Sequence, residues 1–137
     1  MGIVFEYQTM KSHIFGDIRR PIANVLIRAD TGEYIEFHPF IDSGADMTLL
    51  PYSFGLMLGF SEKTGNIKEL HGVRGIGLPV IIKRVKMTLG DIEIEPRVAW
   101  SLIEEVPPLL GRLDIFEKFE ITFKEKEGEI IFEPVES

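Results

Sequence analysis

The sequence predicts a single all-β domain, a small closed or partly closed barrel with one or two short helices. Three observations lead to this fold class. Most segments alternate apolar and polar residues with a period of two and are rich in Val, Ile, Phe and Tyr, which is typical of half-buried strands. Turns follow one another at short intervals, as in small barrels. The length of 137 residues fits one domain, which we expect to span residues 1–137.

Eight segments show the strand-like alternation. They are residues 3–8, 22–29, 34–41, 67–70, 80–88, 92–99, 120–123 and 129–132. Turn-forming residues join the second strand to the third, the fifth to the sixth and the last two to each other. These turns are Asp30-Thr31-Gly32, Leu89-Gly90-Asp91 and Glu127-Gly128.

Two short segments break the alternation and predict helices of one or two turns. Residues 51–58 begin with a proline, which suits the first helical position, and continue with bulky residues at a spacing of three to four. Residues 112–119 place Leu113 and Phe116 on one face of a second helix.

Composition and charge exclude several classes of function. With 15 basic and 22 acidic residues the chain has a net charge of −7, which argues against nucleic-acid binding. The absence of cysteine excludes thiol catalysis, thiolate-bound zinc and disulfides. His13, His38 and His71 lack metal-ligand spacing, so we expect no metal and no cofactor. No apolar run approaches the roughly 18 residues of a membrane span, and we expect a soluble protein with the cytoplasm as its default location.

One carboxylate stands out. Residues 40–51 read FIDSGADMTLLP, so Asp42 follows an apolar run directly. A buried carboxylate without a partner costs several kcal/mol, and something must compensate it. Asp, Ser and Gly also favour chain reversals, and a turn is the simplest interpretation of these three residues alone.

Two later segments change that interpretation. Residues 71–77, HGVRGIG, form a glycine-rich reversal between two expected strands. Residues 109–112, LLGR, stand directly before the second expected helix. In this order and spacing the three segments resemble the retropepsin-like aspartic proteases, the family of the retroviral proteases and their cellular and microbial relatives. The likeness extends from about residue 22 to residue 123, and it implies a small closed β-barrel of the acid-protease type.

The resemblance implies an aspartic endopeptidase that acts as a homodimer on a peptide or protein substrate. Amide hydrolysis by this route needs one carboxylate as general base and one carboxylic acid as proton donor. Two carboxyl groups about 3 Å apart share one proton and can divide these roles. This chain has one such motif, so the second carboxyl group must come from Asp42 of a second copy.

The resemblance also assigns roles around Asp42, the expected catalytic residue. Ser43 supplies the hydroxyl that braces the two active-site loops across the dimer, where the family more often has threonine. Gly44 lets the loop turn and leaves a carbonyl group free for the substrate backbone. Ala45 stands where some relatives carry a hydroxyl group near the carboxylate.

Further positions complete the expected site. Asp46 either contacts the substrate backbone or pairs with Arg112 to tie the active-site loop to the following helix, and both roles remain open. Pro107 and Leu109 are expected to line the side-chain pockets. A flap over the cleft is expected at the glycine-rich reversal, comprising Gly72, Val73, Arg74, Gly75, Ile76 and Gly77.

A second hypothesis belongs to a different class of function. A binding or assembly module can retain the protease fold and bind peptides or proteins with little or no turnover. The intact Asp42, the adjacent hydroxyl and the glycines of the loop favour the enzyme, because inactive sites usually lose one of them. A serine hydrolase is rejected, since Ser43 lacks the strand-turn-helix G-x-S-x-G context.

Overall fold

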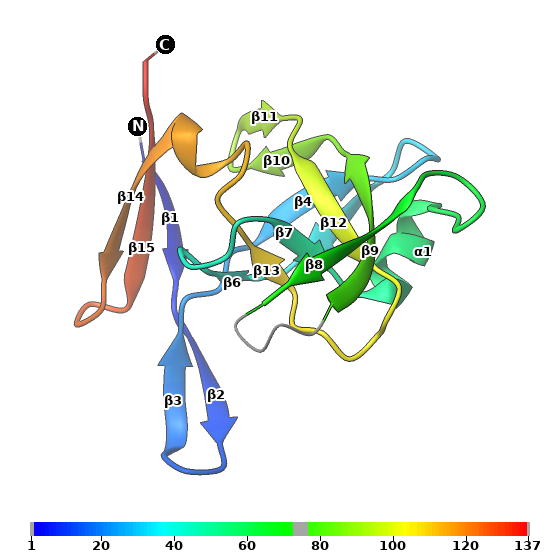
Figure 1. Cartoon of the computed structure of the whole chain (residues 1–137). Helices are drawn as coiled ribbons and strands as arrows, with labels where there is room; N and C mark the ends of the chain where they lie inside the picture. Colours follow the sequence, from blue (N-terminus) through cyan, green and yellow to red (C-terminus); the bar gives the residue numbers. More distant parts are fainter. Residues whose placement is uncertain (1, 73–76, 137) are drawn as a thin grey trace.

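A computed structural model describes residues 2–72 and 77–136 of the chain. In this part the strands form four sheets, accompanied by one α-helix and one 3₁₀ turn (Figure 1). The prediction of an all-β fold with one or two short helices is confirmed. Neither helix of the described part is long and apolar enough to cross a lipid bilayer.

The largest sheet carries the segments that the sequence singled out. Its six strands lie in the order β6 (Phe40–Ile41), β13 (Leu109–Leu110), β7 (Thr48–Leu50), β12 (Arg97–Ser101), β9 (Gly77–Arg84) and β8 (Ile67–His71). The pairs β6–β13 and β7–β12 are parallel, and the other neighbours are antiparallel. Strand β13 therefore lies between the two strands that flank the loop of Asp42.

Three smaller sheets complete the fold. The four-stranded sheet has the order β11 (Ile92–Ile94), β10 (Met87–Leu89), β4 (Val25–Arg28) and β5 (Tyr34–Phe37). The three-stranded sheet consists of β1 (Ile3–Glu6), β15 (Glu129–Pro134) and β14 (Phe119–Lys124). The last sheet is a hairpin of β2 (Gln8–Ser12) and β3 (Gly16–Arg20), which projects away from the rest of the chain in Figure 1.

The α-helix of the described residues, α1 (Tyr52–Leu58), is held against the largest sheet by Trp100. This tryptophan is fully buried, its indole N–H donates to the carbonyl of Tyr52 at 3.0 Å, and its ring stacks on the Tyr52 ring. Gly55 approaches the indole so closely that a side chain there would overlap it. The helix is thus packed on β12 of the largest sheet.

Several expected strands are shorter than the alternation predicted. Segment 34–41 divides into β5 and β6, and segment 92–99 divides into β11 and β12. Pro39 and Pro96 stand at these breaks, where a residue without an N–H group cannot continue a ladder. The three predicted turns are confirmed, and their glycines all have positive φ angles, with values of 93° at Gly32, 60° at Gly90 and 74° at Gly128.

The expected helix over residues 112–119 is wrong except for a short 3₁₀ turn, η1 (Phe116–Lys118). The backbone N–H groups of Arg112 and Leu113 donate to the carbonyl groups of Ala45 at 2.9 Å and Asp46 at 2.8 Å. Asp114 then adopts a left-handed backbone with φ of 66°. The hydrogen bonds tie this segment to the Asp42 loop, and the left-handed backbone of Asp114 interrupts the helical conformation.

Candidate functional site

Asp42 lies at the end of β6, on a turn that closes onto its own carboxylate. Its backbone N–H donates to the carbonyl of Leu110 at 3.0 Å, which ties it to the neighbouring strand β13. The N–H of Gly44 donates to Asp42 Oδ1 at 2.9 Å, and the N–H of Ala45 donates to the Asp42 carbonyl at 3.1 Å. The half-buried carboxylate is thus oriented by its own loop, and the turn interpretation and the site interpretation are compatible.

A buried hydrogen bond of Gly111 joins the segment of residues 109–112 to the start of β7, which follows the Asp42 loop. Its buried backbone N–H donates to the hydroxyl oxygen of Thr48 at 3.0 Å, and Thr48 is fully buried at the start of β7. Sequence reasoning missed this role of Thr48. The available signal was a hydroxyl-bearing residue directly before two apolar residues of a buried strand.

Asp46 and Arg112 form an ion pair at the protein surface. Their side chains are 85% and 54% exposed, so the pair contributes little to the stability of the isolated chain. The expected tie between the loop and the segment after Gly111 is therefore present. Asp46 also lines a cavity beside the Asp42 loop, where a ligand can reach its exposed side chain.

The loop cavity, which lies beside the Asp42 loop, has a volume of about 390 Å³. Its walls are mostly apolar, and the residues that form it are Gly44, Ala45, Asp46, Met47, Leu49, Leu70, His71, Gly72, Leu78 and Leu109. Leu70 and Leu78 belong to the segment that the resemblance places over the cleft, whereas Leu49 was not expected there. Leu70 and Leu78 pair with each other across β8 and β9, and β12 lies between β9 and the strand of Leu49, β7. This strand order, which the sequence does not reveal, places the three residues in one sheet.

Asp42 itself lines a neighbouring cavity of about 370 Å³. Arg20, Pro21, Phe40, Ile41, Pro107 and Leu109 form the rest of that cavity. Leu109 borders both cavities and Pro107 borders only this one. The structure thus brings both expected pocket residues close to Asp42.

The expected flap coincides with the end of the β8–β9 hairpin. Gly77 pairs with His71 in the ladder, and Leu78 pairs with Leu70 one position further from the tip. Gly72 lines the loop cavity. Residues Val73, Arg74, Gly75 and Ile76 were also expected in the flap, and they lie outside the described residues.

Ser43 points to the surface beside Asp42. Its hydroxyl group has no hydrogen-bond partner among residues 2–72 and 77–136. A free donor next to the carboxylate leaves this position open to a group from outside the chain.

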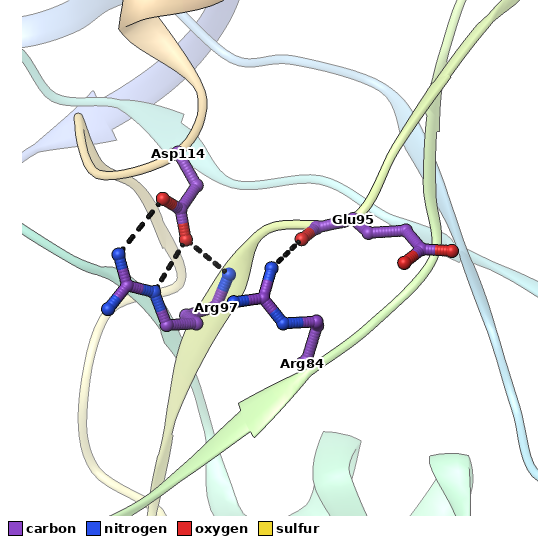
Figure 2. Close-up of polar contacts among 4 residues, drawn as sticks. All are labelled: Arg84, Glu95, Arg97 and Asp114. Carbon is purple, nitrogen blue, oxygen red and sulfur yellow. Dashed lines mark hydrogen bonds and ion pairs between the residues drawn. The ribbon is translucent and has the colours of Figure 1, made fainter.

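A second electrostatic contact anchors the segment after Arg112. Asp114 accepts hydrogen bonds from the backbone N–H of Arg97 at 3.0 Å, from Nε at 2.8 Å and from Nη2 at 3.1 Å (Figure 2). The hydrogen bonds from the Arg97 side chain, and next that from its backbone, hold the pKa of Asp114 well below its usual range. The contact fixes this segment to β12, and sequence reasoning missed it.

No metal centre is present in the described part of the chain. Nowhere in these residues do three His, Asp or Glu side chains gather in a way that could hold an ion.

No protein-family model matches this sequence, and neither does any curated protein. Solved structures do match. A retropepsin-like aspartic protease from Rickettsia conorii is 15% identical, with a TM-score of 0.67 over 96% of this chain and 98% of that chain. The EIAV protease, solved with an inhibitor, is 21% identical, with a TM-score of 0.54 over 79% of this chain and 92% of that one.

A third match is the retroviral protease-like domain of Ddi1 from Leishmania major. It is 12% identical, with a TM-score of 0.54 over 85% of this chain and 95% of that domain. At these identities the likeness establishes the fold. The chain has the retropepsin-like fold, and the resemblance inferred from the sequence is confirmed at that level.

Proposed function

We propose that this chain, which has the retropepsin-like fold, is an aspartic endopeptidase that works as a homodimer. The observation that carries the proposal is the geometry of the Asp42 loop. Its carboxylate is half-buried and is oriented by the Gly44 N–H at 2.9 Å. Asp42 lines an apolar cavity of about 370 Å³, which shares Leu109 with the cavity of about 390 Å³. A carboxylate oriented beside an apolar cleft is a typical arrangement for acid–base chemistry on a bound ligand.

The proposed reaction uses one Asp42 from each copy. The two carboxyl groups share one proton. The ionised group removes a proton from water as the water oxygen attacks the peptide carbonyl carbon, and the protonated group donates its proton to the carbonyl oxygen. Collapse of this tetrahedral intermediate breaks the C–N bond. The leaving nitrogen takes up the proton that the general base removed from water, and a hydroxyl group of the intermediate returns its proton to the other carboxylate, which restores the shared proton.

An extended peptide is the substrate that the cleft suits best. The apolar wall of Met47, Leu49 and Leu78 favours an apolar side chain close to the scissile bond. Gly44 and Asp46 lie along the same wall and offer polar groups to the peptide backbone. In this proposal Asp46 contacts substrate while its pair with Arg112 keeps it in place.

The free hydroxyl of Ser43 supports the need for a second copy. In the dimer it would donate to the loop of the partner and hold the two carboxyl groups at a fixed separation.

The test compares wild-type protein with Asp42→Asn on a mixed peptide library between pH 3 and 8. We expect cleavage by the wild type and a loss of about 10²–10⁴-fold in the variant, because the shared proton and the general base both disappear. Asp91→Asn is the matched control, since Asp91 is exposed on the β10–β11 turn and undergoes the same chemical change.

Two results would refute the enzyme. One is the absence of cleavage at every pH, and the other is cleavage that Asp42→Asn leaves unchanged. A peptide that binds tightly and remains intact would instead identify a binding module, the alternative function with this fold.

A further inference from the structure

The β2–β3 hairpin is tied to the rest of its chain near its base, where Arg19 Nη2 donates to the carbonyl groups of Glu125 at 3.1 Å and Lys126 at 3.2 Å. Its two strands pair with each other over five residue pairs, from Gln8↔Arg20 to Ser12↔Gly16, and with no other described strand. It extends away from the four-stranded and six-stranded sheets (Figure 1). Isolated two-stranded hairpins are at best marginally stable in water, so a surface that covers this one is expected.

The tip of the hairpin is apolar and exposed. Ile14 and Phe15 are 81% and 73% exposed, more than any other large apolar side chain of the described residues. The Ser12 hydroxyl accepts the backbone N–H groups of Ile14 at 3.2 Å and Phe15 at 3.3 Å, so the turn is formed without a partner. Apolar side chains on a preformed support mark an interaction site, because little conformational entropy is lost on binding.

The base of the hairpin joins the face that carries Asp42. The Arg20 guanidinium lies over the Phe40 ring, 5.9 Å from its centre, and Pro21 accepts the backbone N–H of Ile41 at 2.9 Å. Arg20 and Pro21 line the same cavity as Asp42. In a dimer that brings two copies of Asp42 together, the hairpin therefore starts at the interface.

The central strand of the three-stranded sheet, β15, has no free edge. β15 pairs with β1 along one side and with β14 along the other, all within one chain. A strand of a second copy cannot pair with β15 unless it displaces one of them. A second copy can still pair with the outer edges of β1 and β14, and such pairing leaves residues 8–20 available for a further contact.

Charge supports a second copy as the occupant. Residues 8–20 contain three basic side chains, Lys11, Arg19 and Arg20, and one acidic side chain, Asp17, whereas the whole chain has 15 basic and 22 acidic residues. The hairpin is thus basic and the remainder of the chain is acidic. Two copies that exchange hairpins bring these opposite charges together, which favours association.

From these observations we infer that the β2–β3 hairpin is a dimerisation arm, which lies on a second copy of this chain with Ile14 and Phe15 in contact with it. The inference rests on the proposed function, because the shared Asp42 pair is what requires the second copy. Beyond the proposed contacts between the two Asp42 loops, the inference assigns a second dimer contact to residues 8–20.

The experiment measures self-association by sedimentation equilibrium, which does not depend on activity. The arm variant Ile14→Ser/Phe15→Ser is compared with the control Leu56→Ser/Met57→Ser, whose two apolar side chains on α1 are 48% and 59% exposed. We expect the arm variant to weaken the dimer at least about tenfold and the control to leave it unchanged. Its circular dichroism spectrum and thermal unfolding should remain those of wild type under monomeric conditions, since the tip packs on nothing in its own chain.

A second measurement needs no loss of apolar residues. Because the chain lacks cysteine, His13→Cys provides a single thiol at the hairpin turn for an environment-sensitive fluorophore. We expect its emission to shift to the red on dilution, with the same midpoint as the sedimentation data. If the protein dimerises but the emission spectrum does not change with concentration, the proposal of a dimerisation arm is wrong.

The outcomes separate this inference from the proposed function. A dimer that the arm variant forms as tightly as wild type overturns the arm, and peptide cleavage by that dimer would leave the endopeptidase in place. A dimer that depends on the arm but cleaves nothing supports the arm and refutes the endopeptidase. A monomeric wild type in which the arm variant alters only peptide affinity overturns the arm and assigns the tip to the substrate.

Discussion

Replacing Thr48 by valine tests whether the buried hydrogen bond to Gly111 holds the Asp42 loop and the segment of residues 109–112 together. Valine has nearly the same shape, but it lacks the oxygen that accepts the Gly111 N–H at 3.0 Å. A buried donor left without a partner costs about 1–3 kcal/mol, and the additional buried methyl group returns somewhat less than about 1 kcal/mol. We expect a net loss of about 1–2 kcal/mol in the free energy of unfolding.

The assay is urea unfolding at one fixed protein concentration, combined with hydrogen exchange over residues 109–113. With an m-value of about 2 kcal/mol per M, the midpoint should fall by about 0.5–1 M. Exchange at the Gly111 amide should accelerate, and proteolytic activity, where measured, should fall. Thr48→Ser is the matched control, because it keeps the acceptor and loses only the methyl group, so slow exchange at Gly111 should persist. A valine variant as stable as wild type, with unchanged exchange at Gly111, would refute the reasoning.

Two further predictions concern the same region. A Cβ at Gly111 would lie 2.8 Å from the Thr48 nitrogen and closer still to the Met47 carbonyl group. Gly111→Ala should therefore lower the free energy of unfolding by about 3 kcal/mol or more. Gly72→Ala is the control, because its Cβ would meet nothing within 4 Å, and it should change the free energy of unfolding by less than about 0.5 kcal/mol. Thermal unfolding of the two variants checks this, and equal melting temperatures would contradict it. The lowered pKa of Asp114 means that its contacts with Arg97 stabilise the fold above about pH 4 and lose that contribution as the pH falls through the lowered value. Asp114→Asn should therefore be less stable than wild type at pH 6, with a difference that shrinks toward pH 2, and a difference that stays constant over this range would be evidence against the pair.

The sequence predicted those parts of the fold that depend on local chemistry. Alternation of apolar and polar residues located most of the half-buried strands, and glycines located the turns at Gly32, Gly90 and Gly128. The motif around Asp42, with the glycine-rich reversal and the LLGR segment in that order, identified the fold class without any distance or contact. These signals are local because a turn or an exposed face constrains each residue type directly.

The hairpin of β2 and β3 escaped prediction because both of its faces are exposed. Only Ser12 and Ile18 of its strands are even half-buried, so residues 8–20 lack the one-sided pattern that identifies a strand packed on a core. β7 and β13 escaped for the opposite reason. They are short and mostly buried, and an apolar run of two or three residues does not distinguish a strand from any other buried segment.

By itself, the sequence determined the fold class and singled out Asp42, together with the residues expected to lie next to its carboxylate. Only the tertiary structure decided that β13 lies between β6 and β7, that Thr48 accepts the Gly111 N–H, and that Arg97 holds Asp114. Each of these contacts joins residues far apart along the chain. Their existence depends on strand order and register, and these are set by how all the apolar faces pack together, which no single segment of the sequence encodes.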